Sequence, residues 1–141
     1  MRRICNLIAA LMLVLGLCAC GQSAQAKWQE QYDLGVRYLS EGNYEEAIIA
    51  FTAAIELDPK RPEAFIGRGD AYVLSGETED NLSAALADYQ AALDLDETLV
   101  QAWLGLADVY IRQGDYDKAL ELLQEALDKT GGDQSIADKI V

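Results

Sequence analysis

The sequence contains no histidine, and its cysteines are confined to positions 5, 18 and 20 of a 141-residue chain. Acid–base catalysis, zinc binding and thiol chemistry therefore lack the residues that most often perform them. Neither a nucleophile with a base at a recognisable spacing nor a glycine-rich phosphate loop is present. These absences favour a non-catalytic protein that uses no metal and no cofactor.

Basic residues are also scarce, because 11 lysines and arginines stand against 24 aspartates and glutamates, a net charge of −13. A surface this acidic repels the phosphates of nucleic acid, so we expect no nucleic-acid partner. It also repels anionic lipid headgroups, which would keep the folded surface off a membrane. A simpler interpretation stays open, in which the acidity only keeps an exported protein soluble.

Two short acidic stretches, residues 77–81 and 94–97, were considered as calcium sites. A calcium loop of the EF-hand kind needs alternating oxygen ligands, a central glycine and a distal glutamate, and neither stretch supplies that pattern. We therefore interpret both stretches as solvated turns and helix ends.

The first twenty residues have the layout of an export signal. Arg2 and Arg3 form a basic start, residues 4–17 are mostly apolar, and Leu17-Cys18-Ala19-Cys20 resembles a bacterial lipobox. The resemblance implies that residues 1–19 are a signal peptide and that Cys20 becomes the N-terminus, carrying covalent lipid such as palmitate. It further implies an exported protein, anchored to the bacterial cell membrane or outer membrane. The alternative is an uncleaved membrane anchor, but the apolar run is shorter than the roughly 20 residues a bilayer requires.

Removal of the signal peptide would leave Cys20 as the only cysteine, so no disulfide is expected. The stretch after it, up to Ala26, is small and polar, and we expect residues 20–26 to be the lipidated cysteine and a short tether. Six extended residues reach at most about 20 Å, so the folded domain is expected to lie close to the bilayer.

The rest of the chain repeats one pattern of small, aromatic and turn residues. Gly35, Tyr38 and Gly42 recur as Gly69, Tyr72 and Gly76, and then as Ala107, Tyr110 and Gly114. Ala47, Phe51 and Ala54 recur as Ala85, Tyr89 and Ala92, and then as Ala119, Leu123 and Ala126. This pattern resembles the tetratricopeptide repeat, a helix–turn–helix unit of 34 residues. A generic helical bundle with coincidental spacing is the alternative.

The resemblance implies an all-α fold, a right-handed α-solenoid of three tetratricopeptide repeats plus a short C-terminal capping helix. The domain would span residues 27–133, with repeats at about 28–61, 62–99 and 100–133, followed by a capping helix at 134–141. Helices are expected at residues 27–40, 44–57, 62–75, 82–95, 98–112 and 116–129.

Helix ends are expected at glycines and capping residues. Gly42 and Gly114 suit the left-handed conformation that closes a helix. Asn43 and Thr98 each have a glutamate or glutamine three residues later, which predicts capping boxes, and Asp115 is expected to cap the sixth helix. Four extra residues within 77–81 should lengthen the turn of the second repeat and leave its helices intact.

Packing inside each hairpin is expected to pair small residues with small ones. Gly35, Gly69 and Ala107 should face Ala47, Ala85 and Ala119. Tyr38, Tyr72 and Tyr110 should fill the wider gap against Phe51, Tyr89 and Leu123.

A second stripe, on the first helix of each repeat, points away from this packing. The resemblance places it on the concave face, where partners of this family bind. The expected groove residues are Tyr32, Val36, Leu39, Ile66, Asp70, Val73, Leu104, Asp108, Ile111 and Arg112. The alternative is that some of the apolar ones only pack between adjacent repeats.

The mechanism that the resemblance implies is the docking of a peptide or protein segment on the apolar side chains of this stripe. Asp70 and Asp108 would then pair with basic residues of the partner. Some family members bind an acidic peptide C-terminus through lysine and asparagine in the groove. Those residue types are missing from the corresponding positions here, so we do not expect that activity.

The sequence therefore predicts a membrane-anchored, non-catalytic adaptor or assembly factor of the bacterial cell envelope. The alternatives are a small carboxylate-based enzyme or carbohydrate-binding lipoprotein, and a structural spacer with no specific ligand. Because the expected capping helix is short, the face of the sixth helix with Leu120, Leu123 and Leu127 is expected to be partly uncovered. It would then support weak self-association.

Overall fold

A computed structural model describes residues 24–140, and within that range the chain is entirely helices and short connections, without a strand. An N-terminal helix occupies residues 24–41. It is followed by α2 (Tyr44–Leu57), α3 (Pro62–Ser75), α4 (Glu79–Leu95), α5 (Val100–Arg112), α6 (Tyr116–Lys129) and α7 (Gln134–Ile140).

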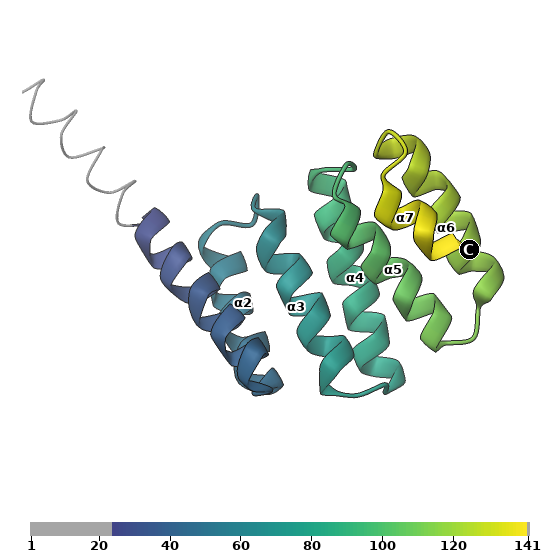
Figure 1. Cartoon of the computed structure of the whole chain (residues 1–141). Coiled ribbons are helices and arrows are strands. Elements are labelled where there is room, and N and C mark those ends of the chain that lie inside the picture. The colour runs from purple at the N-terminus through teal and green to yellow at the C-terminus, as the bar shows by residue number, and fades with distance from the viewer. Residues whose placement is uncertain (1–23, 141) are drawn as a thin grey trace, which may run out of the picture.

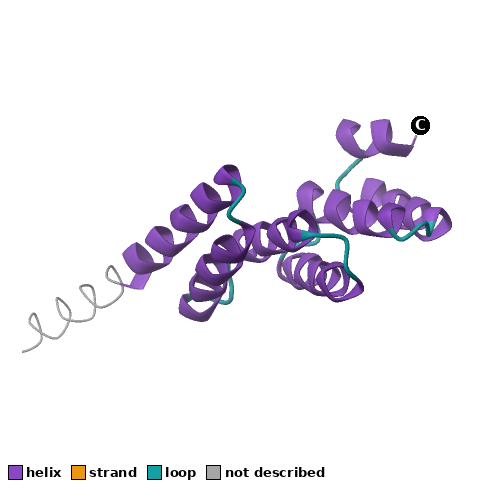
Figure 2. Cartoon of the chain, turned by 90° about the horizontal axis from the view of Figure 1, so that it is seen from below, coloured by secondary structure: helices purple, strands orange, loops and turns teal. Residues whose placement is uncertain are grey.

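The helices stack as successive hairpins along one axis (Figure 1). The N-terminal helix, α3 and α5 form one layer, and α2, α4 and α6 form the layer behind it. Seen from below, the two layers form an elongated array in which each hairpin packs on the next (Figure 2). The expected all-α solenoid of tetratricopeptide type is confirmed. Each short helix gains its stability from these neighbours, since an isolated helix of this length is marginal in water.

The packing of the first two repeats depends on an aromatic ring held between two glycines. A Cβ atom built on Gly35 would lie 2.7 Å from the Phe51 ring, and one built on Gly67 would lie 2.6 Å from the same ring. Tyr89 of α4 lies in the same way between Gly69 and Gly105. The ring of one repeat therefore contacts the first helix of its own hairpin and the first helix of the next.

This arrangement corrects the expected pairing of small residues with small ones. Gly35 and Gly69 face the rings of Phe51 and Tyr89, so the glycines make room for aromatic side chains. The third repeat has Ala107 in place of the first glycine and Leu123 in place of the ring, and both belong to the same buried cluster. Ala107 is larger than the glycine of the other repeats, and Leu123 is smaller than their aromatic ring, so the two changes compensate each other in volume.

A buried ion pair adds a second link between repeats. Arg68 of α3 donates two hydrogen bonds to the carboxylate of Asp88 of α4, from Nε at 2.8 Å and from Nη2 at 2.7 Å. Its Nη1 donates to Thr52 of α2 at 3.0 Å. Asp88 is 4% exposed and is the one buried charged residue of the described part of the chain. Arg68 therefore joins three successive helices. Loss of either Arg68 or Asp88 would leave the other charge unpaired and would destabilise the fold.

Several expected boundaries are wrong by a few residues. Residues 24–26, expected in the tether, are helical, and α4 begins at Glu79 instead of residue 82. The extra residues after Gly76 therefore extend α4 as well as the turn. Thr78 caps α4 by accepting a hydrogen bond from the backbone N–H of Asn81 at 3.2 Å.

The expected helix caps are borne out in part. Asp115 accepts from the backbone N–H of Lys118 at 3.1 Å, as expected. Asn43 makes no capping hydrogen bond, and α5 begins at Val100 because Thr98 bonds instead to Asp96. Gly42 and Gly114 both have φ near +79°, which confirms them as the glycines that close their helices.

The C-terminal end is better covered than expected. α7 packs on α6, and its Ile136 is fully buried. Leu123 is 3% exposed and Leu127 packs against the core, which leaves Leu120, at 40%, as the exposed member of the expected patch. The expected uncovered face is therefore smaller than predicted and is reduced to Leu120, while self-association itself stays a prediction.

Among the described residues, no helix combines the length and the apolar character that crossing a membrane requires. The expected signal peptide and Cys20 lie outside the described residues.

The ring-between-glycines packing predicts the effect of Gly67→Ala. An alanine normally favours a helix interior by roughly 0.5–1 kcal/mol, but its methyl group would overlap the Phe51 ring. Overpacking of this kind costs about 1–3 kcal/mol, so the free energy of unfolding should fall. Urea denaturation followed by circular dichroism measures it.

The control is the same change in a Phe51→Leu background, where the smaller side chain leaves room for the methyl group. The cost of Gly67→Ala should shrink there. An unchanged cost, or a Gly67→Ala chain as stable as the natural one, would contradict the packing described.

Candidate functional site

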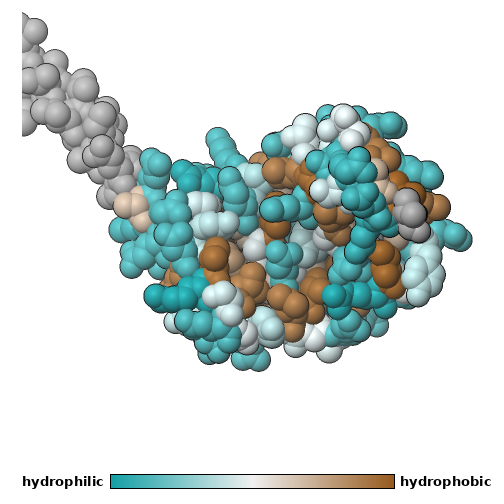
Figure 3. Space-filling view, in the orientation of Figure 1, coloured by the Kyte–Doolittle hydropathy of each residue, from teal (hydrophilic) through white to brown (hydrophobic). Residues whose placement is uncertain are grey.

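A hollow lies on the layer formed by the N-terminal helix, α3 and α5. This central cavity has a volume of about 500 Å³. Figure 3 shows apolar side chains gathered over the same face, between polar margins. The cavity is lined by Leu39, Ile66, Asp70, Val73, Leu74, Tyr89, Gln101, Leu104, Gly105, Asp108, Arg112 and Lys139.

A second hollow of about 220 Å³, the side cavity, lies between the N-terminal helix and α3. It includes Tyr32 and Val36 and shares Leu39, Ile66 and Asp70 with the central cavity. The two hollows are therefore adjoining parts of one groove, which runs across the first helices of successive repeats. We use "the groove" for both cavities together.

Nine of the ten residues expected in the groove line one of its two cavities, and Ile111 is the exception because it packs against the core. Val36 is 44% exposed, whereas Ile66 and Val73 are each 8% exposed and belong to the core cluster. For Ile66 and Val73, packing between repeats is therefore part of their role.

Tyr32 is held in place by its neighbours at the N-terminal end of the groove. Its ring stacks on Trp28 at a centroid distance of 4.9 Å and lies 5.8 Å from the Phe51 ring. The guanidinium of Arg61, in turn, lies 4.1 Å from the Trp28 ring centroid. These contacts fix the N-terminal helix against α2 and α3, and so fix one wall of the groove.

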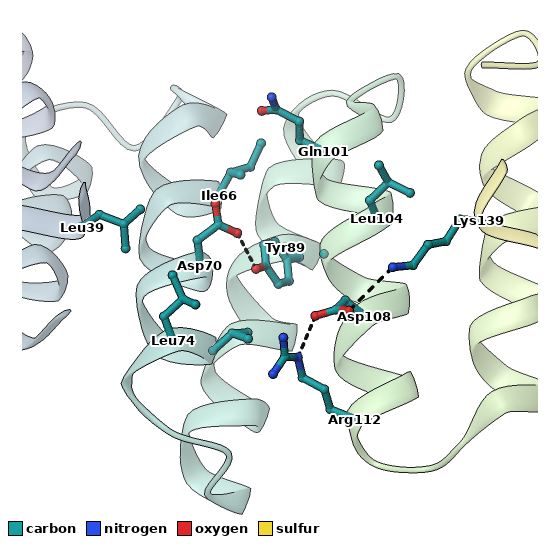
Figure 4. Close-up of a pocket in the computed structure, with 12 residues that line it drawn as sticks. Leu39, Ile66, Asp70, Leu74, Tyr89, Gln101, Leu104, Asp108, Arg112 and Lys139 are labelled. Atoms are coloured by element: carbon teal, nitrogen blue, oxygen red, sulfur yellow. Dashed lines mark hydrogen bonds and ion pairs between the residues drawn. The ribbon is translucent and has the colours of Figure 1, made fainter. Parts of the chain in front are cut away.

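Asp70 lies at the centre of the groove and is half buried. Its Oδ1 accepts a hydrogen bond of 2.6 Å from the hydroxyl of Tyr89 (Figure 4). Burial raises the pKa of Asp70, the Tyr89 hydrogen bond partly opposes that rise, and the nearby negative charge of Asp108 adds to it. The carboxylate is thus held in an environment that disfavours its charge.

Asp108, on α5, is satisfied differently. Its Oδ2 accepts from Arg112 at 2.7 Å, and its Oδ1 lies 3.8 Å from the ammonium of Lys139 on α7. Arg112 also pairs with Glu77, which gives the acidic turn after α3 a structural role. The sequence predicted that Asp70 and Asp108 both pair with basic residues of a partner. In the structure Asp108 already faces two cations of the chain, so the surroundings of the two carboxylates differ.

Nine residues that line the groove were not predicted from the sequence: Phe51, Glu63, Gly67, Leu74, Tyr89, Leu99, Gln101, Gly105 and Lys139. Tyr89, Gly105 and Gly67 line the groove as well as making the ring-between-glycines contacts. Gly67 and Gly105 are separated by the same 38-residue offset as Gly69 and Ala107, so the repeat itself carried the signal. Lys139 reaches the groove from the capping helix, and no pattern in the sequence indicates that.

The described residues contain no group of histidine, cysteine or carboxylate side chains that could hold a metal ion. The groove has apolar walls, one half-buried carboxylate (Asp70) and a cluster of paired charges (Asp108, Arg112 and Lys139). That combination suits the reversible binding of a segment with both apolar and polar side chains.

Similarity to known proteins also indicates a tetratricopeptide repeat protein. A family model described as "Tetratricopeptide repeat" matches residues 78–139, and one described as "TPR repeat" matches residues 35–76. No curated protein matches the sequence significantly.

Solved structures of similar shape include the Sgt2 TPR domain from Aspergillus fumigatus, with a TM-score of 0.70 and 22% identity over 80% of this chain and 74% of that one. The second TPR domain of human RPAP3, in complex with the HSP70 peptide SGPTIEEVD, has a TM-score of 0.71 and 20% identity over 83% and 94%. The Yersinia enterocolitica translocator chaperone SycD has a TM-score of 0.71 and 19% identity over 81% and 83%. At these identities the likeness extends to the fold alone.

The environment of Asp70 predicts that it lowers the stability of the fold at neutral pH. Its pKa in the folded chain is raised above the ordinary value of 3.8, so the folded state binds the proton more tightly than the unfolded state does. The free energy of unfolding therefore falls as the pH rises from the unfolded-state pKa of Asp70 to its higher folded-state pKa. Asp70→Asn keeps an acceptor for Tyr89 and removes the charge, so the variant should be more stable than the natural chain at pH 7.

Thermal unfolding at several pH values tests this. The advantage of Asp70→Asn should shrink as the pH falls and should vanish well below 3.8, where Asp70 of the natural chain is protonated in both the folded and the unfolded state. Asp108→Asn is the matched control, and it should gain nothing because it loses its pairing with Arg112 and Lys139. Equal behaviour of the two variants would contradict the difference in their surroundings.

Proposed function

The chain belongs to the tetratricopeptide repeat family, and on that premise we propose that it is a non-catalytic adaptor or assembly factor that holds a segment of another protein in its groove. Proteins of this family are generally binding scaffolds without catalytic activity. The observation that carries the proposal is the groove itself. It is continuous across three first helices, and its exposed edge includes an apolar side chain, Val36, that is 44% exposed.

The groove has the dimensions and the chemistry of a peptide site. Its central cavity of about 500 Å³ accommodates a few side chains rather than a whole domain. Leu39, Leu104 and Leu74 offer apolar contact along it, and Asp70 and Asp108 lie between them. An extended or helical segment could therefore place apolar side chains on the walls and a polar one at the centre.

We propose further that the segment is apolar with basic residues. The peptide in the human RPAP3 complex, SGPTIEEVD, ends in Glu-Glu-Val-Asp. A segment of that kind would bring carboxylates towards Asp70, whose hydrogen-bond partner Tyr89 is neutral, and like charges at close range weaken binding. The negative charge of the whole chain favours a basic partner as well.

The location we propose is the bacterial cell envelope, with the chain anchored through lipid on Cys20. The support is the sequence of residues 1–20, which has the layout of a lipoprotein signal. Residues 21–23 alone separate Cys20 from the N-terminal helix at residue 24, so the repeats would work beside the membrane. Several acyl chains together would give a stable anchor, which one chain does not.

The binding function predicts that Leu104→Glu abolishes partner recovery. Leu104 lines the central cavity, and a carboxylate there would be desolvated by any apolar segment. Crosslinking in intact cells, followed by affinity purification and mass spectrometry, should recover a specific partner about tenfold less with this variant.

The matched control is Ile49→Glu, because Ile49 is 69% exposed on α2 and lines neither cavity of the groove. This variant should recover the partner as the natural chain does. If neither variant changes recovery, the groove is not the binding site and the chain acts as a spacer or through another face.

The lipid anchor predicts a second, independent result. Cys20→Ala removes the atom that would carry the lipid, so the chain should move from the membrane fraction to the soluble fraction after cell lysis. If the variant stays in the membrane fraction, residues 4–17 act as an uncleaved anchor and the lipid proposal is wrong.

A further inference from the structure

Asp70 differs from the other carboxylates around the central cavity, because its hydrogen-bond partner in the described part of the chain is neutral. The Tyr89 hydroxyl donates to Oδ1 at 2.6 Å, and no lysine or arginine of that part lies within ion-pairing distance of either oxygen. Asp108 pairs with Arg112 and Lys139, and Glu77 pairs with Arg112. A half-buried carboxylate left without a cation is costly, and a ligand that brings one would remove that cost.

The cavity around Asp70 matches the shape of a basic side chain. Leu39 and Ile66 lie on one side of it and Leu104 on the other, with Asp70 between them (Figure 4). Lysine and arginine combine a long apolar stem with a charged end, so they pack the stem on apolar surface while the charge meets a carboxylate. A purely apolar side chain would pack against the walls of the cavity. It would also exclude water from Asp70 without supplying a charge to pair with it.

The chain already brings one such side chain to the cavity. Lys139 extends from α7 towards Asp108, with its ammonium 3.8 Å from Oδ1 and its side chain 43% exposed (Figure 4). α7 is fixed by Ile136, which is fully buried, so the side chain of Lys139 can turn away while the helix stays in place. The distance is near the limit for an ion pair, and an exposed pair of this kind is weak.

We propose that Asp70 is the anchoring point for one lysine or arginine side chain of the partner segment, and that Lys139 competes with that side chain for the central cavity. The proposal rests on the proposed function, and it adds the residue that anchors the basic side chain and a built-in competitor. A cation bound at Asp70 would be a third positive charge beside Arg112 and Lys139, and Lys139 has the weaker pairing with Asp108, so the incoming side chain displaces the Lys139 ammonium towards solvent.

Specificity follows from the same arrangement. A segment without a basic residue must bury Asp70 unpaired, and a segment with an acidic residue adds repulsion. Lys139 lowers the apparent affinity of each ligand that must displace it, by the small free energy of its exposed pair with Asp108. The groove therefore selects basic segments by penalising the others.

Selection from a random peptide library displayed on phage, with the full-length chain immobilised, tests the proposal. The expected result is that enriched peptides carry a lysine or arginine flanked by apolar residues. Enrichment of peptides without basic residues would overturn the proposed role of Asp70 while supporting a peptide-binding groove. No enrichment over the bare support would overturn both that role and the proposed function.

Affinities of one enriched peptide for three variants then test each residue. Asp70→Asn should weaken binding about tenfold, as expected for loss of one partner of a desolvated charge pair. Lys139→Gln should strengthen binding severalfold. Lys129→Gln is the control, since Lys129 pairs with Glu97 away from the groove, and it should change nothing.

Circular dichroism of each variant shows whether it is folded. Asp70→Asn keeps the acceptor for Tyr89, so a folded variant that binds as tightly as the natural chain would overturn the role of Asp70. Equal affinities for Lys139→Gln and the natural chain would overturn the competition.

Discussion

The contact on which this structure depends is an aromatic ring between two glycines on successive first helices. Phe51 lies between Gly35 and Gly67, and Tyr89 takes the corresponding place one repeat later. Because a ring fits only where both neighbours lack a side chain, it fixes the distance between one first helix and the next. That distance leaves the groove between the N-terminal helix, α3 and α5. The fold and the candidate site therefore have one physical origin.

Tyr89 joins the two directly. Its ring packs between Gly69 and Gly105, while its hydroxyl donates to Asp70 at the floor of the central cavity. The same burial that holds the ring disfavours the charge of Asp70. A carboxylate kept in such surroundings lowers stability, which is the kind of cost that accompanies functional sites. The other charges nearby, on Asp108, Arg112 and Glu77, are paired within the chain.

The sequence was informative where a constraint recurs with the repeat. Gly42 and Gly114 close helices because the same turn is needed twice, and the stripe of apolar residues marks the groove because it departs from the hairpin pattern. Contacts that occur once could not be foreseen. Lys139 reaches Asp108 across 31 positions of sequence, a contact that only the final packing sets. Thr98 bonds to Asp96 rather than capping α5, because two local hydrogen-bonding patterns compete at that residue. Tyr89 was assigned to the core alone, because a one-dimensional pattern does not show that a side chain can serve two sites.

The central claim is that the groove holds the partner, and site-specific photo-crosslinking tests it most directly. A photoreactive phenylalanine analogue would replace Val36, at the exposed edge of the groove, or Ile49, on α2 outside it. In intact cells the account predicts a discrete crosslinked product from position 36 that Leu104→Glu abolishes, and none from position 49. A product from position 49 alone, or one from position 36 that Leu104→Glu leaves unchanged, would contradict it.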